Sequence, residues 1–236
     1  MIRILPVEGL PAIREGDDLG ALIAAAVRLE DGDVVVVAQK AVSKAEGRVV
    51  RLDDIEPGHE ALRLAGARDP RQIQAILDES VRLVRERDGF LIAETRHGFV
   101  CGSAGVDASN APEAGTLVLL PLDPDASAER IRQSLGGGVG VVVSDSFGRA
   151  WRMGTTDVAI GVAGLRPLLD LQGRRDPTGY ELHATVIAVA DEIAGAAELA
   201  MRKLAQVPAA IVRGLDLAGE GSARELVMPA ERDLFR

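Results

Sequence analysis

The residues best suited to chemistry in this chain are carboxylates that follow apolar runs. Asp145 and Ser146 follow the largely β-branched run at residues 139–143, with only Ser144 between. In open α/β sheets, ligands gather at the carboxyl ends of strands, and a carboxylate followed by a hydroxyl offers the hard oxygen ligands that Mg²⁺ or Mn²⁺ prefers. Asp and Ser are also common turn residues, so this motif alone favours a cation site and a simple turn about equally.

A second carboxylate lies in the glycine-flanked segment at residues 105–110. There Asp107, Ser109 and Asn110 place an acid, a hydroxyl and an amide within four positions. Taken singly, such a segment is more often an Asx turn than a ligand site. Together with Asp145, however, it predicts two carboxylates on separate loops that share a metal ion and neutralise the phosphates of a nucleotide.

Basic residues follow another apolar run, at residues 34–38. Lys40, Lys44 and Arg48 lie just beyond it and would bring positive charge to the carboxyl end of a strand, where phosphate oxygens would be bound. A solvated basic loop is the more common interpretation of such a segment, although it is more informative in an acidic chain. The glycine-rich residues 136–140 lack the Lys and hydroxyl of a P-loop, and no G-x-G-x-x-G motif follows a strand, so a standard P-loop or Rossmann site is excluded.

Other reactive residue types have no partners at suitable spacing. The histidines at positions 59, 97 and 183 are scattered and are expected to be structural or on the surface. Cys101 is expected to be a small buried hydrophobe. Trp151 could stack on a planar ligand, but simple packing is the more common role.

The elements that must position these residues alternate between helix and strand. Helices are predicted at residues 15–29, with Asp17 or Asp18 as N-cap, at 126–135 and at 181–204, and two more within 56–87, divided at Asp69-Pro70. Strands are predicted at residues 34–38, 90–94, 99–104, 116–120, 139–143, 158–162 and 208–212. The fold class is therefore α/β (α+β), with a mixed sheet and flanking helices. Residues 40–48 and 144–149 are expected to be loops.

Composition restricts the class of protein further. The chain has 236 residues, of which 47% are hydrophobic and only 3% aromatic, so Ala, Val, Leu and Ile must form the core. A formal charge of −9 argues against nucleic acid or an anionic membrane as partner. The single cysteine excludes an internal disulfide, and neither a signal peptide nor an 18-residue apolar span is found, so a cytoplasmic location is expected.

Considered jointly, these segments show a resemblance to the coenzyme F420:L-glutamate ligase family, also called F420-0:γ-glutamyl ligases. The matching motifs occur in the family's order over about residues 4–222, and as a set they are very specific. They are LPVEGLP (5–11), GDDL (16–19), DGDV (31–34), VSKAEGR (42–48), AGVDASN (104–110), LPLDPD (120–125), DSFGR (145–149), ADEIA (190–194) and VRGL (212–215).

The resemblance implies a GTP-dependent ligase that adds L-glutamate through a γ-linkage to the deazaflavin precursor F420-0, by way of an acyl phosphate. It also implies Mn²⁺ or Mg²⁺, a monovalent K⁺, and an intertwined homodimer of unusual, non-Rossmann and non-P-loop architecture. The positions that match the family's metal ligands are Asp107, Asp145 and Ser146. Those that match its GTP contacts are Leu10, Pro11, Ala12, Ile13, Gln39, Lys44 and Asn110. No general base is identified.

Three positions depart from the family's pattern. Ser146 stands where Thr is usual and keeps the hydroxyl, Gln39 stands where Ser is frequent, and Lys203 stands where archaeal members have a metal-binding carboxylate. A lysine at 203 could replace the charge of a cation. The resemblance assigns residues 1–222 to a stand-alone ligase module and leaves 223–236 as a polar tail.

Two other functions are considered. A metal-dependent phosphatase of the haloacid-dehalogenase type would need a second Asp two positions after Asp145, where Phe147 stands instead. A non-catalytic nucleotide-binding protein would not need the intact set of Asp107, Asn110, Asp145 and Lys44.

Overall fold

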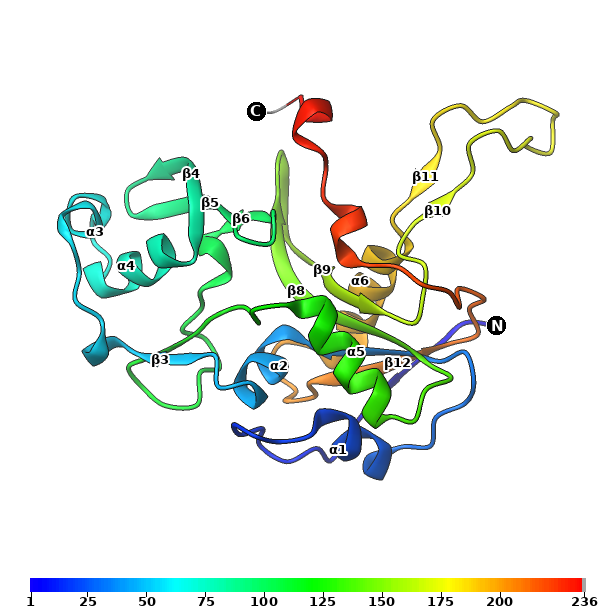
Figure 1. Ribbon diagram of the computed structural model, residues 1–236, viewed down its shortest axis with the longest axis horizontal. Coiled ribbons are helices and arrows are strands. Elements are labelled where there is room, and N and C mark those ends of the chain that lie inside the picture. Colours follow the sequence, from blue (N-terminus) through cyan, green and yellow to red (C-terminus); the bar gives the residue numbers. More distant parts are fainter. Residues whose placement is uncertain (235–236) are drawn as a thin grey trace.

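A five-stranded mixed sheet forms the centre of the molecule in the computed structural model, which describes residues 1–234 (Figure 1). Its central strands, β2 and β8, are parallel, and every other neighbouring pair is antiparallel. The mixed sheet with flanking helices predicted from the sequence is thus confirmed. The strand order is β1 (Arg3–Pro6), β12 (Ala209–Arg213), β2 (Val34–Ala38), β8 (Gly140–Arg149) and β9 (Arg152–Ala163).

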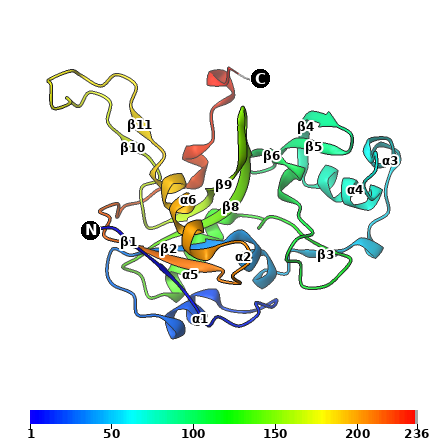
Figure 2. The same ribbon diagram turned by 180° about the vertical axis from the view of Figure 1, so that it is seen from behind.

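Both faces of this sheet are covered by helices. Successive side chains of a strand point to opposite faces. Accordingly, Val35 and Val37 pack in one core with α1 (Leu19–Ala26), α2 (Gln39–Ala45) and α5 (Pro124–Ser134). Val34 and Val36 pack in a second core with α6 (Val189–Met201) (Figure 2). The valine run at 34–37 is therefore buried on both faces, as its composition predicts.

A smaller lobe is inserted between β2 and β8 and has a hydrophobic core of its own. Glu79 of the lobe accepts from Arg48, which precedes the lobe in the chain, at 2.8 Å, and from Arg96 within the lobe at 3.3 Å. The lobe consists of β3 (Val49–Arg51), the 3-10 turn η1 (Leu52–Asp54), α3 (His59–Leu64), α4 (Pro70–Asp78), β4 (Ser80–Arg87), β5 (Phe90–Thr95), β6 (Val100–Gly102), the 3-10 turn η2 (Ser103–Gly105) and β7 (Thr116–Val118).

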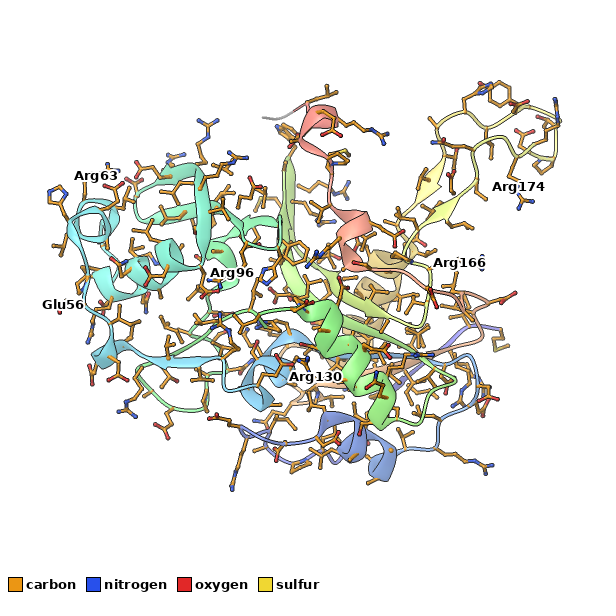
Figure 3. The ribbon with its side chains drawn as sticks, in the orientation of Figure 1. Glu56, Arg63, Arg96, Arg130, Arg166 and Arg174 are labelled. Atoms are coloured by element: carbon orange, nitrogen blue, oxygen red, sulfur yellow. The ribbon has the colours of Figure 1, made fainter. Side chains whose placement is uncertain are left out.

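Two segments extend from the body. The short strands β10 (Leu169–Asp170) and β11 (Val186–Ile187) carry a projecting arm, on which Arg174 lies (Figures 1 and 3). After β12 the chain forms the 3-10 turns η3 (Ala223–Leu226) and η4 (Ala230–Arg232), and Ala223 is buried. The predicted tail at 223–236 therefore starts with a packed residue, and its last two residues lie outside the described ones.

Several sequence predictions need correction. Residues 80–87 form β4 rather than the end of a helix, because they pair antiparallel with β5. Residues 39–45 form α2 rather than a basic loop. The long helix expected from 181 starts only at Val189, since the preceding residues return along the arm, and it ends at Met201. Within residues 1–234, no helix is both long and apolar enough to span a bilayer.

Candidate functional site

The predicted ligand residues Asp145 and Ser146 lie within β8, not in a loop after it. Parallel pairing with β2 ends at Ser144, but pairing with β9 continues, with Asp145 opposite Val158 and Ser146 opposite Asp157. The backbone groups of β8 therefore stay paired beyond the end of β2, and the strand continues through polar residues here. A register shift between Val143 and Ser144 marks this transition.

A cavity of about 630 Å³ opens beside this point and collects most of the predicted site. It lies where the ends of β2 and β8 meet α2, the segment before α1, and the end of α6. Of the predicted residues, its lining contains Leu10, Pro11, Ala12, Ile13, Gln39, Lys44, Asn110, Asp145, Ser146 and Lys203. Asp107 is not itself in the lining, but it is bound to Lys40, which is.

Asp107 is held by a lysine and a serine. Lys40 Nζ lies 2.6 Å from Asp107 Oδ2, and the Ser109 backbone N–H donates to Asp107 Oδ1 at 2.7 Å. The Asx turn considered from the sequence is thus present, but the carboxylate also binds a cation side chain. Burial alone would raise the pKa of Asp107, but the hydrogen bonds from Lys40 and Ser109 together lower it below its ordinary value.

Asp145 has the opposite electrostatic environment. Its pKa is raised to about 7, mainly by burial and also by the nearby charges of Asp157 and Asp107, while the Ser146 backbone hydrogen bond and the charge of Lys40 act to lower it. The charges of Asp107 and Asp145 therefore interact. Negative charge at this point is not fully compensated by the protein.

Sequence reasoning missed a third carboxylate, Asp157 of β9. It is 7% exposed and accepts hydrogen bonds from Ser144 Oγ at 3.0 Å and from Ser146 Oγ at 2.6 Å. The polar residues just before the apolar run at 158–162 were the available signal. Glu198 of α6 also lines the cavity, and its pKa is raised by burial and by the charge of Asp157, while Lys203 acts to lower it.

All three lysines of the chain line this cavity, whereas every other basic residue is an arginine. Lys44 is partly buried, and burial together with the charge of Lys40 lowers its pKa. Lysine offers phosphate a compact point charge. A wall that combines lysines with carboxylates suits a ligand that carries phosphates together with a divalent cation.

The carboxylates and the hydroxyl at the cavity could hold such a cation only together with oxygen ligands from water and from substrate phosphates. Over residues 1–234, no group of three or more His, Cys, Asp or Glu side chains is arranged to hold a metal ion. Mg²⁺ usually takes only one or two protein carboxylates and completes its shell with water and substrate phosphates. Asp107, Asp145 and the Ser146 hydroxyl supply hard oxygen ligands of that kind, and a cation beside Asp145 would lie near the charges of Asp107 and Asp157.

The remaining predicted residues differ in accessibility. Gln39 is 2% exposed, and its Nε2 donates to Ser43 Oγ at 2.7 Å and to the Leu119 carbonyl at 3.0 Å, so its amide nitrogen is bound within the protein. Asn110 is exposed at the cavity with a left-handed backbone, φ 54°.

Three residues that were expected to be structural have clear positions. His97 Nε2 lies 3.0 Å from the Pro121 carbonyl, a structural contact. Cys101 is buried, and burial raises the pKa of its thiol to about 12, which leaves it unreactive. Trp151, expected to pack, is instead 82% exposed at the turn between β8 and β9.

Comparison with known proteins agrees with the motifs. The family model described as F420-0:Gamma-glutamyl ligase matches residues 9–214. A protein named coenzyme F420:L-glutamate ligase from Archaeoglobus fulgidus is 45% identical over 242 residues, covering 100% of this chain and 96% of the relative. Proteins of the same name from Methanothermobacter thermautotrophicus and Methanocaldococcus jannaschii are 44% and 41% identical, each over 100% of this chain and over 99% and 97% of the relative, respectively.

Proposed function

The chain belongs to the F420-0:gamma-glutamyl ligase family, and from this premise we propose that it is a GTP-dependent ligase of coenzyme F420 biosynthesis. It adds L-glutamate through a γ-linkage to the precursor F420-0 and releases GDP and phosphate. The observation that carries this proposal is the cavity lined by Lys40, Lys44 and Asp145, with Asp107 bound to Lys40 at its edge.

The proposed chemistry follows from the poor reactivity of a carboxylate as acyl donor. A carboxylate oxygen of the precursor attacks the γ-phosphorus of GTP, and GDP leaves with the electron pair of the broken P–O bond. The glutamate amine then attacks the acyl carbon, loses a proton, and displaces inorganic phosphate. The charge on the transferring phosphoryl group is the main obstacle, so fixed positive charges and orientation matter most.

Each part of the cavity has a role in this proposal. Lys44 contacts the phosphates, and the apolar residues 10–13 and Asn110 contact the nucleotide. Asp107, Asp145 and Ser146 would hold Mn²⁺ or Mg²⁺, which would offset phosphate charge. A bound K⁺, a homodimer, and a cytoplasmic location are further parts of the proposal.

An assay with F420-0, glutamate, GTP and Mn²⁺, followed by mass spectrometry, tests the proposal. We expect the precursor to gain one or more glutamyl units and GDP to accumulate in equal amounts. Asp145→Ala is expected to abolish both products, because it removes a carboxylate at the cation site. Asp216→Ala, on an exposed loop after β12, is the matched control and is expected to keep full activity.

Two outcomes would contradict the proposal. A purified protein that binds GTP but never extends the precursor would be the binding protein considered above. Turnover in Asp145→Ala equal to that of Asp216→Ala would remove Asp145 from the site. The phosphatase alternative gains no support, because Phe147 packs against the hydrophobic core where a second carboxylate would be needed.

A further inference from the structure

Asp157 is a buried carboxylate that the proposed function leaves without a role. It lies on β9, directly opposite Ser146 of β8. Both hydrogen-bond donors to its oxygens are serine hydroxyls of that neighbouring strand: Ser144 binds Oδ2 at 3.0 Å and Ser146 binds Oδ1 at 2.6 Å. The carboxylate is thus fixed at both oxygens.

A purely structural role explains Asp157 poorly. Its charge raises the pKa of Asp145 and of Glu198, so it places a third negative charge near two others. The two donors that hold it are neutral hydroxyls rather than basic groups. Burying a carboxylate that lacks a cationic partner is unfavourable, and a neutral acceptor could bind both serines at lower cost.

The effect on Ser146 suggests what the carboxylate is for. A serine hydroxyl has one proton and two lone pairs. Because the proton of Ser146 is donated to Asp157, its lone pairs must point elsewhere, and both residues line the cavity. A hydroxyl that donates its proton to a carboxylate is also a more electron-rich ligand. Residues that are hydrogen-bonded to metal ligands generally act in this way, because they orient the ligand and raise its basicity.

We propose that Asp157 is a positioning residue that turns the lone pairs of the Ser146 hydroxyl toward a divalent cation in the cavity. This inference rests on the proposed function, which places that cation beside Asp145 and Ser146. Ser144 has the auxiliary role: it is 1% exposed, and its bond to the second oxygen prevents the Asp157 carboxylate from rotating.

The test is a titration of Mn²⁺ alone into the full chain, with free Mn²⁺ measured by electron paramagnetic resonance. Asp157→Asn and Asp157→Ala both remove the charge, but only Asn keeps an oxygen that can accept from Ser146. We expect the Ala variant to bind Mn²⁺ about 10-fold or more weakly than the Asn variant, within the 10- to 100-fold range of outer-partner substitutions. In a Ser146→Ala background this difference is expected to vanish.

The controls separate positioning from folding and from the proposed function. Asp216→Ala is expected to leave the Mn²⁺ affinity unchanged, and thermal unfolding of each variant reports structural damage. If Asp157→Ala does not fold, Asp157→Ser replaces it, because its shorter side chain does not reach Ser146. Equal affinities of the Asn and Ala variants, or a difference that persists without Ser146, would overturn the positioning role. Absence of saturable Mn²⁺ binding by the unsubstituted protein would instead overturn the proposed cation site.

Discussion

The positive charge of Lys44 is poorly solvated, because its side chain is partly buried. Burial and the neighbouring charge of Lys40 lower its pKa. Replacing it with Met keeps a chain of similar length and removes the charge. We expect Lys44→Met to raise the Kd for GTP by about tenfold or more, roughly 1.4 kcal/mol, measured by calorimetry. Because a desolvated charge is lost, the melting temperature is expected to stay the same or to rise.

The matched control is Arg63→Met on α3, at the outer surface of the lobe (Figure 3). Arg63 pairs with Glu60, but both side chains are more than half exposed, so the pair contributes little. Its loss is expected to change neither the Kd for GTP nor the melting temperature appreciably. A GTP affinity of Lys44→Met equal to that of this control would remove Lys44 from the phosphate contact.

At the scale of single residues, the sequence indicated many of the residues that line the cavity, but not which side chains hydrogen-bond to one another there. Asp145, Ser146 and Lys44 were found because their types and positions after apolar runs are informative. Asp157 was not found, because its significance depends on the pairing of β9 with β8, which a single sequence does not specify. The bond between Lys40 and Asp107 joins residues 67 positions apart and was equally out of reach.

The sheet itself depends on an ion pair between β12 and the turn before β2. Asp33 is 1% exposed, and Arg213 donates to both of its oxygens, at 2.7 Å each. Burial alone would raise the pKa of Asp33, but the Arg213 side chain and the Glu30 backbone N–H lower it overall. Asp33→Asn is expected to lower the free energy of unfolding by about 3 kcal/mol at neutral pH, because it leaves Arg213 partly unpaired.

The pH dependence of this loss has a definite sign. A carboxyl group whose pKa is lower in the folded state stabilises the fold above its unfolded pKa, which is about 3.9, and this contribution disappears as the pH falls through the folded value. Urea unfolding at neutral pH and at about pH 3 should therefore show the difference between Asp33→Asn and the unsubstituted chain shrinking in acid. Glu60→Gln, which breaks an exposed pair, serves as the control and should show little difference at either pH. A constant difference for Asp33→Asn would contradict the assignment.

At the scale of elements, sequence patterns succeeded where burial dominates. The run at 34–38 and the core of β8 are apolar on both faces, and the structure has strands there. The sequence pattern gave the wrong element where tertiary contacts decide between helix and strand. Residues 80–87 could form either helix or strand by local preference, and pairing with β5 selects strand. The junction of β9 with α5 shows the same dependence, because a Cβ at Gly161 would lie 2.2 Å from the Pro124 carbonyl oxygen.

At the scale of the whole molecule, the distribution of lysine makes amine chemistry selective. The three ε-amines all line the cavity, and the remaining amine is the α-amine of the exposed Met1. An amine-selective acylating reagent is therefore expected to inactivate the ligase with few modifications. GTP with Mg²⁺ should protect Lys40 and Lys44, as measured by peptide mass spectrometry.

Met1 is the internal control for this experiment, since its α-amine lies outside the cavity and should react to the same extent with and without GTP. The lowered pKa of Lys44 keeps more of its amine neutral and hence reactive. Labelling of Lys40 and Lys44 that GTP leaves unchanged would contradict binding of the nucleotide in this cavity.

The long pairing of β8 with β9 couples the candidate site to the slowest motions of the chain. The pairing that starts among the buried valines of β8 resumes after the register shift at Val143 and Ser144 and extends past Asp145 and Ser146. A fluctuation that separates these two side chains must also disturb amide bonds at the centre of the sheet. Backbone amides around the site should therefore be among the last to exchange with deuterated solvent. The side chains of Asp145 and Ser146 would then be held in place by the sheet, with no further loss of entropy from ordering a loop. Changes in substrate preference would arise in the segments around these two residues.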